Sequence, residues 1–455
     1  MKLNSQPYPL KFYGMKHLIK ILFLLPLTLA IDQLACAQKL LTINEAIAAA
    51  LNNNYDIRLL KNDSVSFALD NSYKNAAFLP RVNASTGMLF NDNHQKQKLS
   101  DGSTKQQNNV RSNNITASIA LNWTVFDGFK MFATRDKLAE IVKLGELNIR
   151  NQLVNTIAAI ITNYYNIVRQ KQQLKAIEEQ MSINEDRVKL AEKKFSVGLG
   201  AKPELLQARV DLNAQRASRL NQQTMIAQLK DQLNQLMAAP LNTRYEVADS
   251  IPINKDLVIG NILNSAGNNN PALLIAKQNI TIANFTLKER KAERYPTISI
   301  NSAYNYSRTM NKTVLNTFTP LLNRNNGFNY GITATIPVLN GYNNKRQVQQ
   351  AQLNIDYNKI MYDNIRAKNE IAISNAYKSY ELQINTLELE EDNILLAKEN
   401  VFIAVERLKL GISTYLELRE TQKSLEDAYN RLIAARYNTK VAETELLRLE
   451  GDLVK

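Results

Sequence analysis

The stretch "KKFSVGLGAKPELLQARVDL", residues 193–212, decides how this chain is organised. Its glycines, Gly198 and Gly200, interrupt a long polar region that otherwise contains few residues that break helices. A phosphate-binding loop would need a strand before it and a Gly-Lys-Ser or Gly-Lys-Thr sequence after it, and neither is present. We therefore interpret the stretch as a turn between two helices.

A second stretch, "ERLKLGISTYLELRETQKSL" at residues 406–425, has the same pattern. Two glycine pairs are separated by 213 positions, and a proline pair further upstream is separated by 216. These pairs are Gly198 and Gly411, Gly128 and Gly341, and Pro80 and Pro296. A repeat this long indicates two large units rather than a solenoid of small ones. The sequence predicts a first repeat over 38–240, a linker over 241–256 and a second repeat over 257–455.

Both repeats show the same order of predicted elements: a helical segment of about 35 residues, two strands, a very long helix and a second helix. Thr42 and Glu45 have the spacing of a capping box at the first helical segment. The predicted strands are 81–91, 114–127, 297–307 and 328–339, separated by polar loops at 92–112 and 308–326. The predicted helices that follow them are 128–196, 203–239, 341–409 and 414–450.

The long helices are too long for a compact globule. About 67 residues at about 1.5 Å each give a helix of about 100 Å. Apolar residues recur along the first one at steps of three, four or seven, which is typical of a helix that packs along a seam. They are Leu153, Ile157, Ile160, Tyr164, Ile167, Leu174 and Met181.

The four strands alternate between apolar and small polar residues. In "NITASIALNWTVFDG", residues 114–128, Ile115, Ile119 and Trp123 share one face, whereas Thr116 and Ser118 share the other. This alternation is typical of a strand in an outer-membrane barrel, and the length of about 10–13 residues suffices to cross a bilayer at a tilt. A soluble antiparallel sheet that packs on a helix alternates in the same way and remains the alternative.

Four strands cannot close a barrel, and open edges in lipid would leave backbone groups without hydrogen bonds. Two copies would give an eight-stranded barrel filled with side chains, and three would give twelve strands with a lumen. Because the polar face consists of small residues, we expect three copies. The predicted fold class is an α+β membrane protein, with long helical hairpins and four strands per protomer in a shared barrel.

The N-terminus is typical of a signal peptide over residues 1–37. Lysines precede the apolar run "ILFLLPLTLAI" at 21–31, and Ala35-Cys36-Ala37 offers a small-x-small cleavage site before Gln38. The alternative is a lipoprotein in which Cys36 is acylated. Cleavage before Gln38 would leave the mature chain without cysteine.

The composition argues against histidine- and metal-based catalysis, whereas carboxylate chemistry remains possible, although no pair of acids stands out in the sequence. The chain has two histidines and one cysteine, so a histidine-based triad or a zinc site is not expected, and no cofactor is indicated. The formal charge is +14, but no nucleic-acid-binding motif accompanies it.

The duplicated order of elements, the junctions "WTVFDGF" and "IPVLNGY", and the paired turns together resemble the TolC family of outer-membrane efflux proteins. The resemblance covers nearly the whole mature chain. It implies a homotrimer with a twelve-stranded barrel in the outer membrane and a helical tunnel across the periplasm. It also implies a passive conduit, without catalysis, for small molecules such as drugs and metals or for proteins. The implied partners are outer-membrane lipid, a periplasmic adaptor and an inner-membrane pump of the RND or ABC type.

The resemblance also implies roles for individual residues. The two turns would dock the adaptor, through Val197, Gly198, Leu199, Leu410, Gly411 and Ile412. Glu417 and Glu420 match an acidic ring at the periplasmic entrance, although Thr414 and Glu417 also have capping-box spacing, which would give the acid a purely structural role. Members of the family close the entrance with tyrosine and arginine, and here those positions hold Leu408 and Ser413.

Gly128, Gly341 and Pro337 mark the predicted junctions from strand to helix. The alternative to a channel is a periplasmic coiled-coil adaptor of an export system. Such an adaptor would have one helical hairpin flanked by β domains, rather than two hairpins with paired strands.

Overall fold

The computed structural model describes residues 40–316 and 318–453. The predicted signal peptide and Cys36 lie outside these residues. The chain divides into two compact units. One contains the chain up to Asn54, Thr156–Asp256 and Lys378–Glu445; the other contains Tyr55–Asn155, Leu257–Tyr377 and the chain from Leu446. Each unit therefore combines segments from both sequence repeats.

The two repeats contain the same α-helices and strands in the same order, and the short 3-10 helix η1 stands in the first repeat only among the described residues. The first consists of α2 (Ile43–Asn53), α3 (Tyr55–Ser72), η1 (Ala76–Phe78), β1 (Arg81–Lys98), β2 (Thr104–Phe126), α4 (Lys130–Ser196) and α5 (Lys202–Met237). The second consists of α6 (Ile259–Asn269), α7 (Pro271–Ala292), β3 (Thr297–Asn311), β4 (Leu322–Thr335), α8 (Asn343–Lys409) and α9 (Tyr415–Glu450).

The long helices of the two repeats correspond residue for residue. α4 and α8 both have 67 residues, α5 and α9 both have 36, and each pair begins and ends 213 positions apart. The short helices α2 and α6 both have 11 residues and lie 216 positions apart. The repeat detected from a few glycines and prolines is therefore a repeat of structure, which is least regular in the strands and in α3, with 18 residues against 22 in α7.

The first helical segment is not continuous, contrary to the prediction. The predicted capping box is present, since Thr42 Oγ1 accepts from Glu45 N–H and Glu45 Oε2 accepts from Thr42 N–H. The segment then breaks at Asn54, between α2 and α3. Asn54 is buried and its amide donates to the Leu236 carbonyl at 2.8 Å. A side chain that bonds to a distant backbone group in this way can interrupt a helix without glycine or proline.

The strands form one antiparallel sheet with the order β1-β2-β3-β4. They are longer than predicted, because most of the predicted polar loop at 92–112 is paired strand, and the loop is confined to residues 99–103. The predicted loop at 308–326 likewise shrinks to 312–321. Backbone pairing continues through asparagine, glutamine and lysine, whose low strand propensity does not prevent it. At the other end β4 stops at Thr335, before Pro337, which lacks the N–H that a ladder needs.

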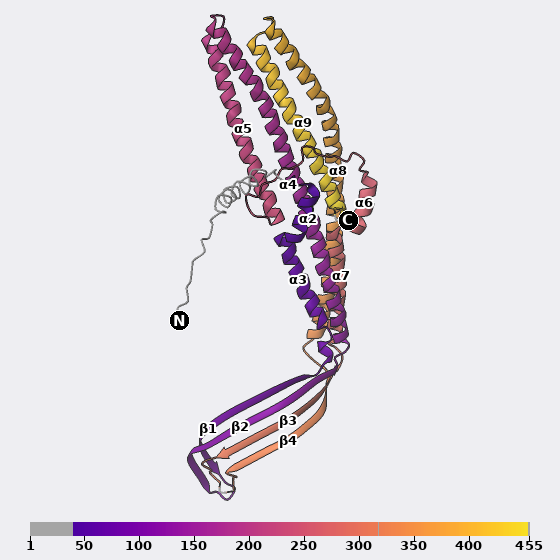
Figure 1. The fold of residues 1–455 in the computed structure, drawn as a ribbon. Helices are drawn as coiled ribbons and strands as arrows, with labels where there is room; N and C mark the ends of the chain where they lie inside the picture. The colour runs from indigo at the N-terminus through magenta and orange to yellow at the C-terminus, as the bar shows by residue number, and fades with distance from the viewer. Residues whose placement is uncertain (1–39, 317, 454–455) are drawn as a thin grey trace, which may run out of the picture. The chain divides into compact units, whose positions relative to one another are not determined.

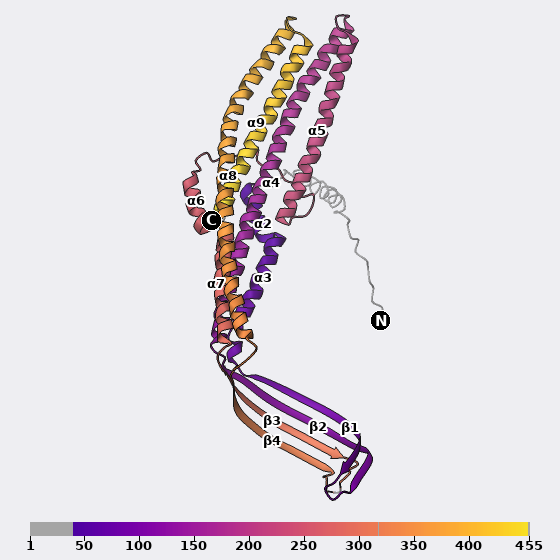
Figure 2. The same cartoon turned by 180° about the vertical axis from the view of Figure 1, so that it is seen from behind.

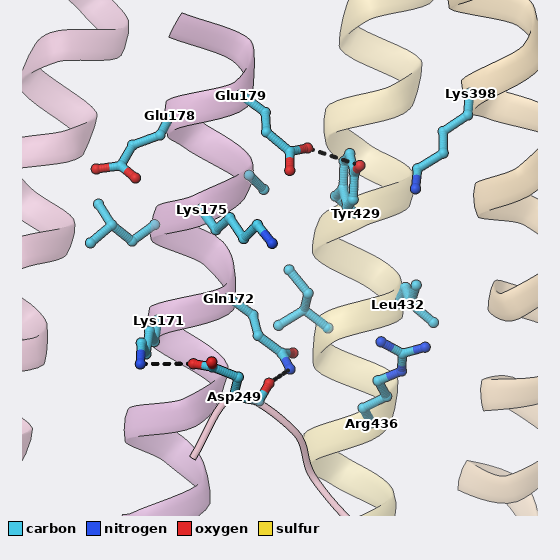
Figure 3. Close-up of a pocket in the computed structure, with 13 residues that line it drawn as sticks. Lys171, Gln172, Lys175, Glu178, Glu179, Asp249, Lys398, Tyr429, Leu432 and Arg436 are labelled. Atoms are coloured by element: carbon cyan, nitrogen blue, oxygen red, sulfur yellow. Dashed lines mark hydrogen bonds and ion pairs between the residues drawn. The ribbon is translucent and has the colours of Figure 1, made fainter. Parts of the chain in front are cut away.

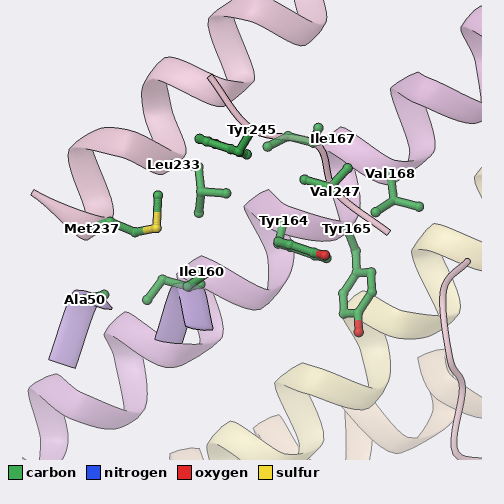
Figure 4. Close-up of a cluster of buried hydrophobic side chains, with 11 residues drawn as sticks. Ala50, Ile160, Tyr164, Tyr165, Ile167, Val168, Leu233, Met237, Tyr245 and Val247 are labelled. Atoms are coloured by element: carbon green, nitrogen blue, oxygen red, sulfur yellow. The ribbon is translucent and has the colours of Figure 1, made fainter. Parts of the chain in front are cut away.

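Two helical hairpins, α4 with α5 and α8 with α9, lie side by side with α9 next to α4 in both views (Figures 1 and 2). A cluster of buried side chains from α2, α4, α5 and residues 245–247 forms a hydrophobic core in the unit that contains Thr156–Asp256 (Figure 4). Ile157, Ile160, Tyr164 and Ile167 of the predicted seam are buried. The Tyr164 hydroxyl also donates to the Leu41 carbonyl at 2.8 Å and accepts from Ala248 N–H at 3.0 Å.

Candidate functional site: the two helical turns and the sheet

The two turns end their helices with the same hydrogen-bond pattern. In the first, Gly198 N–H donates to the Phe195 carbonyl at 3.1 Å and Leu199 N–H donates to the Lys194 carbonyl at 2.9 Å. In the second, Gly411 and Ile412 make the equivalent bonds to Leu408 and Arg407 at 3.1 and 3.0 Å. This is the Schellman arrangement, in which a left-handed residue reverses the helix. Both glycines have a left-handed backbone, with φ of +77° and +72°, at the predicted turns.

The apolar residue after each glycine is exposed, contrary to the usual behaviour of this motif. The residue in that position commonly packs against the last turn of its own helix. Here Leu199 is 82% exposed and Ile412 is 67% exposed. The helix residues in position to receive them are Lys194 and Arg407, which offer a charge rather than an apolar surface. The requirements of the turn therefore do not explain these apolar side chains.

Glu417 and Glu420 follow the second turn but differ in their surroundings. Glu417 N–H donates to Thr414 Oγ1 at 3.2 Å, as a helix cap requires. The Glu417 carboxylate accepts from Ser413 Oγ at 2.7 Å and pairs with Arg407 at 3.1 Å. Glu420 is exposed and lines a hollow between the two hairpins. The charge of Glu417 is thus partly neutralised within its own turn.

The positions that depart from the family pattern are built into the second turn. Leu408 is buried in a small cluster with Ala404 and Leu418. Ser413 is the hydroxyl that bonds to Glu417. These two residues stabilise the turn itself.

Sequence reasoning missed an ionic cluster near the turns. Arg187 on α4 is 9% exposed and pairs with Asp211 on α5 at 2.9 Å. Asp211 also lies 4.0 Å from Arg419 on α9 and accepts from Gln207. This cluster connects the two hairpins. Arg187 and Asp211 stand at equal distances before and after residue 199, so pairing opposite charges across the predicted turn could have revealed them.

A pocket of about 670 Å³ lies between α4 and α9 (Figure 3). Its charged side chains pair largely with neighbours: Lys171 bonds to Asp249 at 2.7 Å, and the Tyr429 hydroxyl donates to Glu179 at 3.0 Å. Burial, together with the hydrogen bond to Glu179, raises the pKa of Tyr429 to about 12. Lys398 lies over the Tyr429 ring, 5.3 Å from its centre. Such internal pairing is typical of a groove that helps to hold two helices together.

The two strand-to-helix junctions share a backbone conformation but not an environment. Gly128 and Gly341 have φ of +72° and +61°. A side-chain carbon on Gly128 would lie 2.3 Å from the Ala292 carbonyl oxygen, whereas Gly341 faces open space. Pro337 is exposed in the segment between β4 and α8. The first junction is thus packed against the second repeat, and the second junction has no such neighbour among the described residues.

The sheet gathers the predicted apolar residues on one face. The cross-strand pairs Ala84–Ile119, Ile119–Tyr304 and Tyr304–Phe328 lie along one line of that face. Met88, Phe90, Tyr330 and Ile332 on the two outer strands are each more than half exposed. A contiguous apolar face of this kind marks an interaction with lipid or another macromolecule. In residues 40–316 and 318–453, none of the helices combines the length and hydropathy needed to span a bilayer.

A carboxylate- or imidazole-based metal centre is not evident in the described part of the chain, where no three aspartate, glutamate, histidine or cysteine residues are grouped suitably.

Comparison with known proteins identifies the family. The model of the family described as outer membrane efflux protein matches residues 46–239 and 262–452. The chain is similar to the outer membrane efflux protein BepC of Brucella suis, with 23% identity over 97% of this chain and 91% of that protein. It is also similar to the outer membrane protein TolC of Escherichia coli, with 20% identity over 77% of this chain and 72% of that protein.

The fold is similar to that of the CmeC outer membrane channel of Campylobacter jejuni. The TM-score is 0.76 at 17% identity, with 91% of this chain and 86% of that chain covered. The match of the family model to both repeats decides against the alternative of a periplasmic adaptor. The chain belongs to the outer membrane efflux protein family.

Proposed function

We propose that three copies of this chain form the exit duct of a tripartite export system. The strands of the three copies close into one twelve-stranded barrel in the outer membrane, and the helical hairpins line a tunnel in the periplasm. A periplasmic adaptor connects this tunnel to an inner-membrane pump of the RND or ABC type. The duct itself is passive and carries out no catalysis.

The observation that carries this proposal is the open sheet. Its outer strands, β1 and β4, each pair on one side only. Every residue of β4 is exposed, including the apolar residues Phe328, Tyr330 and Ile332. Unpaired backbone groups on such an edge cost several kcal/mol each in lipid, so a single copy is not stable there. Further copies of the chain would satisfy both edges.

We assign adaptor docking to the two turns. Leu199 and Ile412 extend from equivalent positions, and the neighbouring Val197 and Leu410 are also exposed. Three copies present six such turns. Burying an exposed leucine or isoleucine against a partner contributes about 1.5–3 kcal/mol, which corresponds to about a 10- to 150-fold change in affinity for each residue.

We assign the acidic entrance ring mainly to Glu420. Arg407 and Ser413 bind the Glu417 carboxylate and partly neutralise its charge. Glu420 should therefore attract a passing cation more strongly than Glu417 does. Glu420→Gln should therefore weaken cation preference in single-channel recordings more than Glu417→Gln does. Equal effects of the two variants, or no effect of either, would remove this assignment.

The test of the duct is planar-bilayer conductance of the purified protein, together with its mass in detergent. We expect a trimer that conducts. A monomer that forms no channels would overturn the proposal.

The test of docking is the double variant Leu199→Ser with Ile412→Ser. We expect wild-type conductance and mass, but lost efflux in cells, because the side chains are exposed in the free protein. Leu241→Ser, which changes a leucine with a similar exposure of 70% in the linker, is the control and should leave efflux intact. Efflux that survives in the double variant would reject the assignment.

A further inference from the structure

We infer the register in which two copies of this chain pair, from the internal repeat of the chain itself. The inference rests on the proposed assembly and specifies its partner surface: strand β4 of one copy pairs with β1 of the next, so that residue numbers of opposed residues add up to 420. Thr335 then faces Ser85 of the neighbour, and Ile332 faces Met88. Helix α8 correspondingly packs against α3 of the neighbour.

The basis is that the two β-hairpins have the same internal register over their equivalent parts, from Arg81 to Asn93 in the first and from Thr297 to Thr309 in the second. Asn83 pairs with Ala120 in the first hairpin. Adding 216 to 83 and 213 to 120 gives 299 and 333, and Ser299 does pair with Thr333. The same offsets relate Arg81–Asn122 to Thr297–Thr335. The two hairpins are therefore equivalent in register as well as in order.

The chain contains one junction between the first repeat and the second, formed by β2 and β3. Asn122 pairs with Asn301 and Ile119 pairs with Tyr304 across it. A ring of copies also needs the reverse junction, from the second repeat to the first repeat of the next copy. If equivalent repeats meet in equivalent ways, adding 213 to the β2 residue and subtracting 216 from the β3 residue gives the outer pairs. Asn122–Asn301 thereby becomes Thr335–Ser85.

The deduced register preserves the chemistry of both faces. It places Ile332 opposite Met88 and Tyr330 opposite Phe90, so the apolar face continues from one copy to the next. It places Thr335 opposite Ser85 on the small polar face. A slip of one residue would set apolar side chains against the polar face, which a sheet with two different faces does not tolerate.

The helices next to the sheet support the same junction. Within the chain α7 packs against α4, as Gln278 Nε2 donates to Glu140 Oε2 at 2.6 Å and Lys137 pairs with Glu289. The equivalent helices at the outer junction are α3 and α8, and both carry apolar side chains that are more than half exposed. These are Leu59, Val65, Leu69 and Tyr73 on α3, and Leu353, Tyr357 and Ile360 on α8.

Gly341 fits the same scheme. Its equivalent, Gly128, packs tightly against the Ala292 carbonyl within the chain. The offset of 216 relates Ala292 to Ala76, so Ala76 of the next copy would fill the open space at Gly341. The neighbour that Gly341 lacks within its own chain is thus Ala76 of the next copy.

The experiment is disulfide crosslinking of paired cysteine variants in outer membranes. Thr335→Cys is combined with Ser85→Cys, or with Asn83→Cys or Gly87→Cys, which lie one step to either side on the same face. Directly opposed residues can form a disulfide, whereas diagonal neighbours at about 7–8 Å cannot do so without strain. We expect crosslinked oligomers on a non-reducing gel with Ser85→Cys, at least about tenfold above either flanking pair. Each single variant controls for random contacts.

The outcomes separate this inference from the proposed assembly. Crosslinking that is strongest with Asn83→Cys or Gly87→Cys would overturn the register while the trimer stands. A trimer by mass that crosslinks with none of the three would overturn the pairing of β4 with β1. A monomer by mass would instead overturn the proposed function.

Discussion

Asn270 caps α7, and its amide bonds to α9 and also to Asn369 Oδ1 of α8 at 3.2 Å. Its replacement tests whether the buried end of α9 depends on one side chain. Asn270 is buried, and its amide donates to the Leu449 carbonyl at 2.8 Å, in the last turn of α9. Its side-chain oxygen accepts from Ala272 N–H and Leu273 N–H at 2.9 and 3.2 Å, which caps α7. The variants Asn270→Ala and Asn270→Ser distinguish these two roles, because serine caps a helix but is too short to reach Leu449.

The expected magnitudes follow from the groups that lose partners. Leaving the Leu449 carbonyl buried without a donor costs about 1–3 kcal/mol. Losing the cap costs about 0.5–2 kcal/mol more. Asn270→Ala should therefore destabilise by about 1.5–5 kcal/mol, and Asn270→Ser by about 1–3 kcal/mol. Urea unfolding of the detergent-solubilised protein, followed by circular dichroism at the helix band, measures both.

Two results would refute this reasoning. If the urea midpoint of Asn270→Ala equals that of the wild type, neither the bond to Leu449 nor the helix cap stabilises the fold. Asn270→Ser that is as unstable as Asn270→Ala would show that the cap contributes nothing.

Three further predictions concern single side chains. Arg187→Ala should destabilise the fold by about 1–3 kcal/mol, because the mostly buried Asp211 carboxylate would keep only the 4.0 Å pair with Arg419 and the hydrogen bond from Gln207. Arg209→Ala, which removes an exposed ion pair, should cost under about 1 kcal/mol, and the urea midpoints of the two variants test this difference. Because the pKa of Tyr429 is raised to about 12, its neutral form stabilises the fold fully below about pH 10, the ordinary pKa of tyrosine, and this contribution is lost as pH rises through 12. Between pH 10 and pH 12 the free energy of unfolding of Tyr429→Phe should therefore fall less than that of the wild type. An equal fall in both proteins would contradict the raised pKa of Tyr429. Gly128→Ala should reduce the yield of folded protomer, with a cost of about 2–5 kcal/mol from left-handed strain and the 2.3 Å contact. Gly341→Ala shares the left-handed strain, about 1–2 kcal/mol, but not the contact, so it should cost the protomer less and reduce the trimer fraction by mass. Equal folded yields for the two variants would count against the packing of the first junction.

The long helices could be predicted from the sequence almost to the residue. The prediction of 128–196 compares with Lys130–Ser196 in the structure, and that of 341–409 with Asn343–Lys409. These boundaries could be predicted because a glycine with a left-handed backbone lies next to each end of both long helices. The break at Asn54 could not be predicted from the sequence, because it depends on a hydrogen bond to Leu236, 182 residues away.

The strand ends and the buried ionic cluster could not be predicted from local sequence alone. Residues 92–112 are rich in asparagine, glutamine and lysine, which predict a loop, yet backbone pairing to the opposite strand extends β1 and β2 through them. The pairing of Arg187 with Asp211 follows from the sequence only if a hairpin centred on residue 199 is assumed, and the burial of the two side chains required the structure. The turns could be located from sequence, whereas the exposure of Leu199 and Ile412 required the structure.

The equal lengths of the paired helices restrict how this protein can change. A residue inserted into α4 alone would rotate everything beyond it by about 100° and advance it by about 1.5 Å relative to α8, so the two turns would no longer stand level. The repeats do differ in length by three residues, since the offset falls from 216 to 213, and that difference lies in the β-hairpins, between the starts of the first strands and the ends of the second. Insertions and deletions should therefore accumulate at the hairpin ends at 99–103 and 312–321. The helical hairpins should lengthen or shorten only in matched pairs.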